Sequence, residues 1–287
     1  MKSLAQLGRY FFAIPFCVFG IQYFLYGHYA GGLSPVPPWA PGGAVGAYVI
    51  GAFLVIAAIS LLANWNARLF AALLGLVYLL CVLLLHSQHF SDIIYNGRER
   101  TRALEPLSLS GAAFVLARRS PSTAAAARWN SFIDKLAKLG RYFFSLPLLI
   151  YGLQHFLYAS FIATLIPAWM PARLFLAYFT GVAFIAAGLS ITSGIAARLG
   201  CFFLGLMFLL WTVLLHAPRV VTHLNNGDEW SSAFVALAMA GASFLLLPSF
   251  SERTEKDNPF LIRKSSSLPI VPRLQIPAWW SAGRPAV

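Results

Sequence analysis

The sequence predicts an all-α membrane protein with eight transmembrane helices, arranged as two parallel four-helix repeats. Hydrophobic residues make up 59% of the chain and charged residues 10%, about half the charge that a soluble domain carries. The mean hydropathy is +0.71, and several apolar segments approach the roughly 20 residues that a helix needs to cross a bilayer. The third observation is an internal repeat, which divides these segments into two sets of four.

The repeat is visible as two copies of the same short motifs. Residues 7–12 (LGRYFF) return 132 positions later as residues 139–144, and residues 84–86 (LLH) return 130 positions later as residues 214–216. A two-residue deletion in a Gly- and Pro-rich stretch accounts for the change of offset. Two copies of one sequence predict two copies of one fold, so a polar residue kept in both copies is expected to matter to that fold or its function.

Each repeat supplies four apolar segments of helical length. The predicted spans are residues 10–26, 43–63, 69–86, 103–117, 142–158, 173–192, 198–216 and 231–248. The first span follows basic residues, as a signal peptide does, but its copy at 142–158 is internal, so both are expected to be true spans. The segment 103–117 is the least apolar. Its Pro106 is tolerated in a first helical turn, and Arg118 and Arg119 can extend to the interface, so we retain it as a span.

Outside the spans lie a linker and a C-terminal tail. The predicted parts are a first membrane repeat at 1–118, a cytoplasmic linker at 119–138, a second membrane repeat at 139–248 and a cytoplasmic tail at 249–287. The linker contains an alanine run and is expected to be partly helical over 124–138. The tail is polar and basic, cannot build a core, and is expected to be disordered or to lie on the lipid surface through Trp279 and Trp280.

The distribution of cations predicts the orientation. With alternating spans, sixteen Lys and Arg residues fall on one side of the membrane and five on the other. The positive-inside rule then predicts that both termini lie in the cytoplasm. The membrane that we expect to hold the protein is the inner, cytoplasmic membrane. The net charge of +12 reflects this topology and attraction to anionic lipids, and not nucleic-acid binding. Four spans per repeat is an even number, so the two repeats are expected to run parallel.

The polar residues kept in both repeats gather at the non-cytoplasmic end. A Gln and a Tyr four residues apart share one face of the first helix, a His ends the third helix, and a Glu precedes the fourth helix, where it suits the helix N-terminus. If the first, third and fourth helices of a repeat pack together, these side chains converge on one ligand-binding site. The candidate residues are Gln22, Tyr26, His86 and Glu99 in the first repeat and Gln154, Tyr158, His216 and Glu229 in the second.

Such a site suits the head group of a quinone, because an amide or imidazole can donate to each carbonyl and a carboxylate can exchange protons. The same residues can also be explained by structural roles alone. A Gln in a membrane helix often joins two helices, a Tyr at a helix end often lies in the interface belt, and Arg68 and Arg198 are expected to be positive-inside anchors. No zinc motif occurs, and a bis-His haem needs facing ligands in mid-bundle, so no metal or haem is expected.

Four of these motifs together resemble the DoxX/DoxX-like family. They are Leu-Gly-Arg-x-x-Phe before Gly-x-Gln-[Tyr/His]-Phe, a Pro-rich loop with Trp, Leu-Leu-His at the end of a helix, and Asn-Gly-x-Glu before another. The resemblance covers residues 4–118 and 136–248 and implies two fused four-helix membrane units. Through the family it also implies a subunit of a quinone-linked, respiratory-type redox complex, with lipids and other membrane or periplasmic redox subunits as partners.

Two other classes of function remain open. One is a non-catalytic accessory subunit that binds lipid and a redox partner, so the sequence leaves undecided whether the chain takes part in an enzyme reaction. The other is a small-solute transporter, which parallel repeats permit. A transporter needs a polar site near the middle of the membrane, whereas the polar residues recognised here lie at one end of the predicted helices.

Overall fold

The computed structural model describes residues 2–29, 40–122 and 129–250. Within these ranges all regular structure is helical, so the predicted all-α class is confirmed. Trp39, the alanine run of the linker and the C-terminal tail lie outside the described residues, and the predictions made for them stay predictions. Contacts among the helices join the described residues into one packed unit.

Four long helices come from each half of the described chain. The first half, residues 2–122, contains α1 (Lys2–Tyr26), α2 (Gly43–Ala63), α3 (Ala67–Leu80) and α5 (Gly97–Arg119); the second half, residues 129–250, contains α7 (Asn130–Leu157), α9 (Arg173–Ser193), α10 (Ala197–Trp211) and α12 (Gly227–Leu246). Shorter elements are the π-helical turns η1 (Cys81–Leu85) and η3 (Thr212–His216), the 3-10 turns η2 (His86–His89) and η4 (Leu247–Phe250), and the helices α4 (Phe90–Tyr95), α8 (Ala159–Leu165) and α11 (Ala217–Thr222).

An asparagine side chain caps the N-terminus of both α5 and α12. The Asn96 side chain accepts a hydrogen bond from the backbone N–H of Arg98 at 2.9 Å. Asn226 accepts one from the N–H of Asp228 at 3.0 Å. Asparagine is among the best N-caps because its side-chain oxygen satisfies an amide that has no partner inside the helix. The two Asn-Gly motifs of the sequence therefore act as helix starts.

Six of the helices are long and apolar enough to cross a membrane. They comprise residues Ser3–Tyr26, Gly43–Ala63, Ala67–Leu85, Arg173–Ser193, Ala197–Thr222 and Gly227–Phe250. A seventh span results if α7 and α8 count as one, although the chain bends by 95° between them. The helix α5, predicted as a span over 103–117, does not meet this measure. Its first turns carry Arg and Glu, and its second half is buried by other helices, so protein contacts replace the apolar surface that lipid would require.

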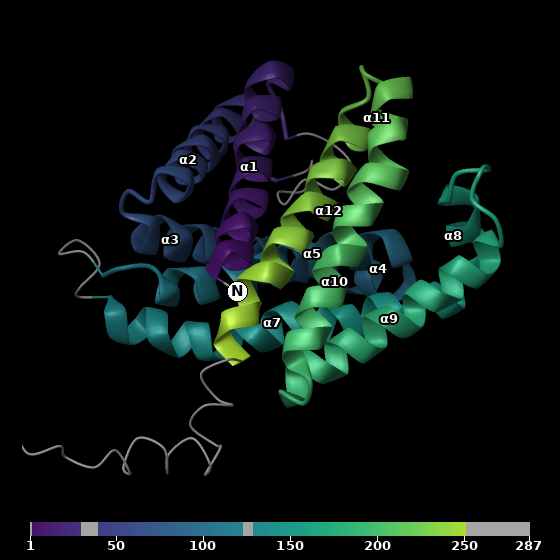
Figure 1. Cartoon of the computed structure of the whole chain (residues 1–287). Coiled ribbons are helices and arrows are strands. Elements are labelled where there is room, and N and C mark those ends of the chain that lie inside the picture. The colour runs from purple at the N-terminus through teal and green to yellow at the C-terminus, as the bar shows by residue number, and fades with distance from the viewer. Residues whose placement is uncertain (1, 30–39, 123–128, 251–287) are drawn as a thin grey trace, which may run out of the picture. The chain divides into compact units, whose positions relative to one another are not determined.

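The fourth long helix of each half packs against the first long helix of the other half. Helix α1 packs along α2 and α12, and α7 packs along α9 and α5, while α3 contacts α5 and α10 contacts α12. Figure 1 shows α12 lying between α1 and α10. The premise that the first, third and fourth helices of one repeat pack together is therefore corrected, because α1 meets the fourth helix of the second half.

Glycines permit these two contacts across the halves. A Cβ atom added to Gly241 on α12 would lie 2.7 Å from the carbonyl oxygen of Gly8 on α1. A Cβ added to Gly140 on α7 would lie 2.6 Å from the carbonyl oxygen of Gly111 on α5. Both distances are too short for real carbon–oxygen contacts, so the two helix pairs approach until their backbones touch. Small residues serve helix packing in membranes in this way.

Candidate functional site

The two glutamines of the candidate set join the halves of the molecule. Gln22 on α1 donates through Nε2 to the Gly227 carbonyl at 3.4 Å and accepts through Oε1 from the Ser231 hydroxyl at 3.2 Å. Gln154 on α7 donates to the Gly97 carbonyl at 2.9 Å and to Thr101 Oγ1 at 3.3 Å. Both glutamines are buried. Each therefore ties the first helix of its own half to the Asn-Gly end of the fourth helix of the other half.

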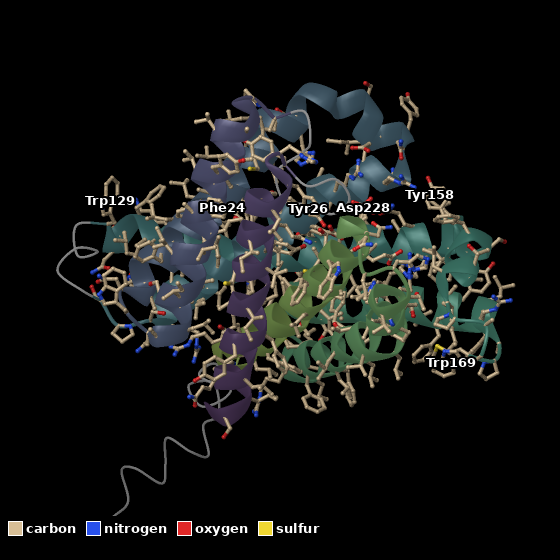
Figure 2. All side chains as sticks on the ribbon, turned by 90° about the horizontal axis from the view of Figure 1, so that it is seen from above. Phe24, Tyr26, Trp129, Tyr158, Trp169 and Asp228 are labelled. Carbon is tan, nitrogen blue, oxygen red and sulfur yellow. The ribbon has the colours of Figure 1, made fainter. Side chains whose placement is uncertain are left out.

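The two tyrosines of the set cover the same helix starts. A Cβ on Gly227 would lie 3.1 Å from the Tyr26 hydroxyl, and a Cβ on Gly97 would lie 2.8 Å from Tyr158 Cε2. Figure 2 shows Tyr26 next to Asp228, the residue after Gly227. Both rings are partly exposed, and the Tyr158 hydroxyl accepts from Arg100 Nη2 at 3.3 Å. Their packing on glycine continues the contact that the glutamines begin.

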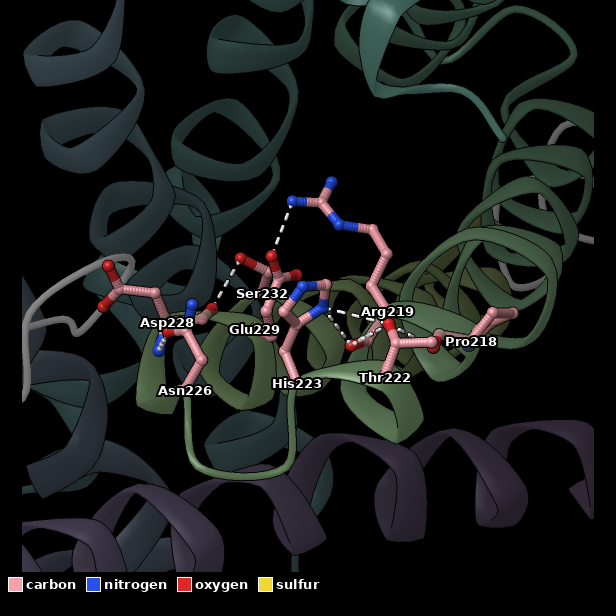
Figure 3. A network of polar contacts seen from close by, with 8 residues as sticks. All are labelled: Pro218, Arg219, Thr222, His223, Asn226, Asp228, Glu229 and Ser232. Carbon is pink, nitrogen blue, oxygen red and sulfur yellow. Dashed lines mark hydrogen bonds and ion pairs between the residues drawn. The ribbon is translucent and has the colours of Figure 1, made fainter. Parts of the chain in front are cut away.

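The two glutamates form ion pairs near their helix starts. Glu99 pairs with Arg102 at 2.8 Å within α5. Glu229 pairs with Arg219 of α11 at 2.7 Å, and its other oxygen, Oε2, is buried with no hydrogen-bond partner in the described part of the chain. Figure 3 shows the Arg219–Glu229 pair and the turn that leads into α12. Glu99 is thus held by a pair within its own helix, whereas Glu229 keeps a buried oxygen that can accept a hydrogen bond.

The turn between α11 and α12 is held by its own side chains (Figure 3). The His223 ring nitrogen Nδ1 lies 2.9 Å from Thr222 Oγ1 and 3.1 Å from the Arg219 carbonyl. Ser232 donates to the Asp228 carbonyl at 2.8 Å. Because these contacts fix the turn, Arg219 and Glu229 are positioned by local structure on both sides.

The two histidines that end the third helices lie next to π-helical turns. His86 follows η1 and is buried, and His216 is the last residue of η3. Nδ1 of His216 is buried with no hydrogen-bond partner among the described residues, and the ring lies within electrostatic reach of Arg219 and Glu229. Single π turns inside helices are frequent at functional sites. The structure therefore brings His216 and Glu229 together, in a cluster that also contains Arg219.

Arg68 has a role that the sequence analysis missed. It is buried, with 6% of its surface exposed, and donates to the carbonyls of Ala117 and Arg118 at 3.3 and 3.1 Å. It also pairs with Asp134 of α7 at 3.2 Å. Its sequence counterpart Arg198 is exposed. Arg68 thus binds the C-terminal end of α5 to the start of α7, and the Asp at 134, which has Lys2 as its counterpart, was the available sequence signal.

A second missed group lies between α5 and α7. Tyr151 and Ser108 are buried, and their hydroxyls have no hydrogen-bond partner within the described ranges other than each other. The Tyr151 hydroxyl lies next to Ser108 and within electrostatic reach of Glu105. One turn further along α7, the His155 ring packs against Trp211 and against Phe184, which the Tyr151 ring also contacts. The signal in the sequence was the loss of the repeat at these positions, since apolar residues replace this polar group in the other half.

Among the described side chains, no three His, Cys, Asp or Glu residues lie close enough to hold a metal ion together. Comparisons of the chain with protein-family models, with curated proteins and with solved structures found no match. Its function therefore has to be inferred from the residues and their contacts.

Proposed function

We propose that the chain is an accessory subunit of a membrane complex and that its paired polar residues hold the subunit together. The observation that supports this most directly is the use of the two buried glutamine amides. Gln22 and Gln154 both bond across the halves, to Ser231 and Thr101 respectively. Hydrogen bonds of this kind stabilise helix contacts in membranes. The resemblance to the DoxX-like family makes a quinone-linked redox complex the assembly that we propose.

The proposed arrangement has eight spans in two parallel four-helix repeats. Six helices have the length and composition of spans, and α7 with α8 makes a seventh. We propose α5 as the eighth, because it packs along α7, α3 and α12 and so needs little apolar surface of its own. The matching contacts of α1 with α12 and of α7 with α5 support a repeat in which the fourth helices are exchanged.

The proposed location is the inner membrane with both termini in the cytoplasm, on the basis of the cation distribution. A phosphatase that folds only outside the cytoplasm, inserted after Tyr95, should be active. The same enzyme fused after Phe250 should be inactive, whereas a fluorescent protein fused there should fold and emit. Activities measured in intact cells would contradict the orientation if the two positions gave the reverse pattern.

The cluster of His216, Arg219 and Glu229 supports a second candidate, a binding site for a quinone head group. Nδ1 of His216 and Oε2 of Glu229 are both buried without a partner in the described structure. A head group could accept a hydrogen bond from the imidazole, and the carboxylate could take up a proton. In this case the chain would take part in the redox reaction and not only in assembly.

One purification distinguishes the two candidates. The full-length protein, extracted in a mild detergent, should carry partner proteins that mass spectrometry identifies, and its quinone content should be the same in wild type and His216→Ala. If instead the protein binds a quinone at this cluster, His216→Ala should lower the bound quinone about five- to 150-fold, the effect of losing one hydrogen bond. Val221→Ala, which changes an exposed side chain of α11, is the control. A protein that purifies alone and without quinone would contradict both candidates.

A further inference from the structure

The contact between α5 and α7 contains polar residues that the matching contact between α12 and α1 lacks. Glu105 and Ser108 on α5 correspond to Val235 and Ala238 on α12, 130 positions later. Tyr151 on α7 corresponds to Phe19 on α1, 132 positions earlier. Because the apolar version packs the same pair of helices, packing alone does not require the polar group. The polar residues of this contact therefore call for another explanation.

Three buried oxygen atoms in this contact have no further hydrogen-bond partner among the described residues: Gln154 Oε1 has none, and the neighbouring hydroxyls of Ser108 and Tyr151 have only each other. Ser108 is fully buried, and Tyr151 and Gln154 are 7% and 8% exposed. A buried polar atom without a partner costs free energy, and such atoms in native proteins usually bind something that the protein chain does not itself supply. Three of them along one helix contact indicate a site for a ligand.

Glu105 adds a carboxyl group to the same place. It makes no hydrogen bond and no ion pair within the described part of the chain, and the guanidinium of Arg102, which bonds to Glu99 at 2.8 Å, lies within electrostatic reach of it. Tyr151 connects it to the buried oxygens, because its hydroxyl lies next to Ser108 and within electrostatic reach of Glu105. The carboxyl belongs to a residue about 12 Å along the helix axis from Gly97, at a rise of about 1.5 Å per residue. Ionisable residues within membrane bundles mark ion or substrate sites more often than not.

The oxygens follow one face of each helix. Thr101, Glu105 and Ser108 are four and three residues apart on α5, which places them on a single face. Tyr151 and Gln154 are three residues apart on α7, and Gln154 bonds to Thr101 at 3.3 Å. The two faces therefore meet, and their side-chain oxygens follow the contact in order from Thr101 to Ser108.

The chemistry of these groups selects a small cation. Once ionised, the Glu105 carboxylate can only accept, so a ligand that keeps it ionised must donate hydrogen bonds or carry positive charge. Hard cations prefer oxygen ligands, and a single carboxylate matches a single charge. We propose that Glu105, Ser108 and Tyr151 hold a monovalent cation, with Na⁺ as the ion to test. The ion would join α5 to α7, and nothing in the accessory-subunit proposal requires it.

The test measures the unfolding temperature of the purified full-length protein in detergent, through its tryptophan fluorescence. Choline chloride is replaced stepwise by NaCl at constant ionic strength. An ion that binds only the folded state raises the free energy of unfolding by RT ln(1 + [Na⁺]/Kd). We therefore expect the unfolding temperature to rise as the Na⁺ concentration rises. Equal unfolding temperatures in the two salts would overturn the proposal, and they are the result expected if water alone fills the site.

Variants localise the effect. Glu105→Val, which copies Val235 of the other half, and Glu105→Gln, which keeps the shape of the side chain, should both remove the response to Na⁺. Tyr151→Phe should raise the half-saturating Na⁺ concentration at least five-fold. Ser231→Ala, which changes the matching contact between α12 and α1, should respond like the wild type. A full response in Glu105→Gln would overturn the proposal even if Glu105→Val failed to fold.

Discussion

Replacing Gly241 with leucine should leave almost no folded protein in the membrane. The Cβ of any larger residue would lie 2.7 Å from the Gly8 carbonyl oxygen, and the other nearest atoms, from Phe11 and Phe12, also belong to the backbone of α1, so no side chain can move aside. Glycine to alanine in a helix usually stabilises by about 1 kcal/mol. Here Gly241→Ala should instead destabilise by about 1–3 kcal/mol, the usual cost of overpacking, and leucine by more. The yield of monodisperse protein in size-exclusion chromatography measures both.

Gly111→Leu should have the same effect through α7, because Gly111 meets the backbone of Gly140 and Phe144. Ala186→Leu is the matched control, since Ala186 lies on an exposed position of α9 and the added carbons would face outward. Its yield should equal that of the wild type. Normal yields of Gly241→Leu and Gly111→Leu would show that the halves do not meet through these glycines.

Arg68→Ala should destabilise the protein by about 2–3 kcal/mol. The substitution removes three contacts of a buried cation, and hydrogen bonds to charged groups are worth about 1.5–3 kcal/mol each. Part of the loss should be recovered because the cost of burying the guanidinium disappears as well. Unfolding of the purified protein by SDS, followed by tryptophan fluorescence, gives the difference.

Arg198→Ala provides the comparison within the same molecule. Arg198 occupies the corresponding place in the sequence but is exposed, so its removal should cost less than about 1 kcal/mol, as is usual at a surface. If both variants lost the same stability, burial of Arg68 would not be the cause, and its contacts with α5 and α7 would have to be discounted.

The apolar pattern predicted the bounds of a helix well where the helix ends at the same residues as the apolar segment. The segment 43–63 was predicted as found, and α9 extends one residue beyond the predicted 173–192. Helix α7 was harder to delimit, because it begins at Asn130, inside the predicted linker. Its first turns pack against α5 while carrying polar residues, so hydropathy places its start too late.

The pairing of helices could not be read from the sequence. Gly8, Gly111, Gly140 and Gly241 were visible as repeated residues, but a repeated glycine is compatible with contacts inside a half or across the halves. Only the distance from each glycine to a particular backbone decides this. For the same reason the sequence identified Gln22 and Gln154 but not their partners, and it gave Arg68 the role of an anchor because it could not show that the side chain is buried.

The exchange of fourth helices has a consequence for how such a protein can arise. A shorter chain with only one set of four helices would have to meet a second copy of itself to make the contacts of α1 with α12, as in a swapped homodimer. Joining both sets in one polypeptide makes that encounter independent of concentration. In a single chain the two contacts no longer need to have the same sequence. The contact between α5 and α7 can therefore contain Glu105 and Tyr151, while the contact between α12 and α1 contains Val235 and Phe19. A fusion of this kind would turn a symmetric dimer into one chain with two different sides.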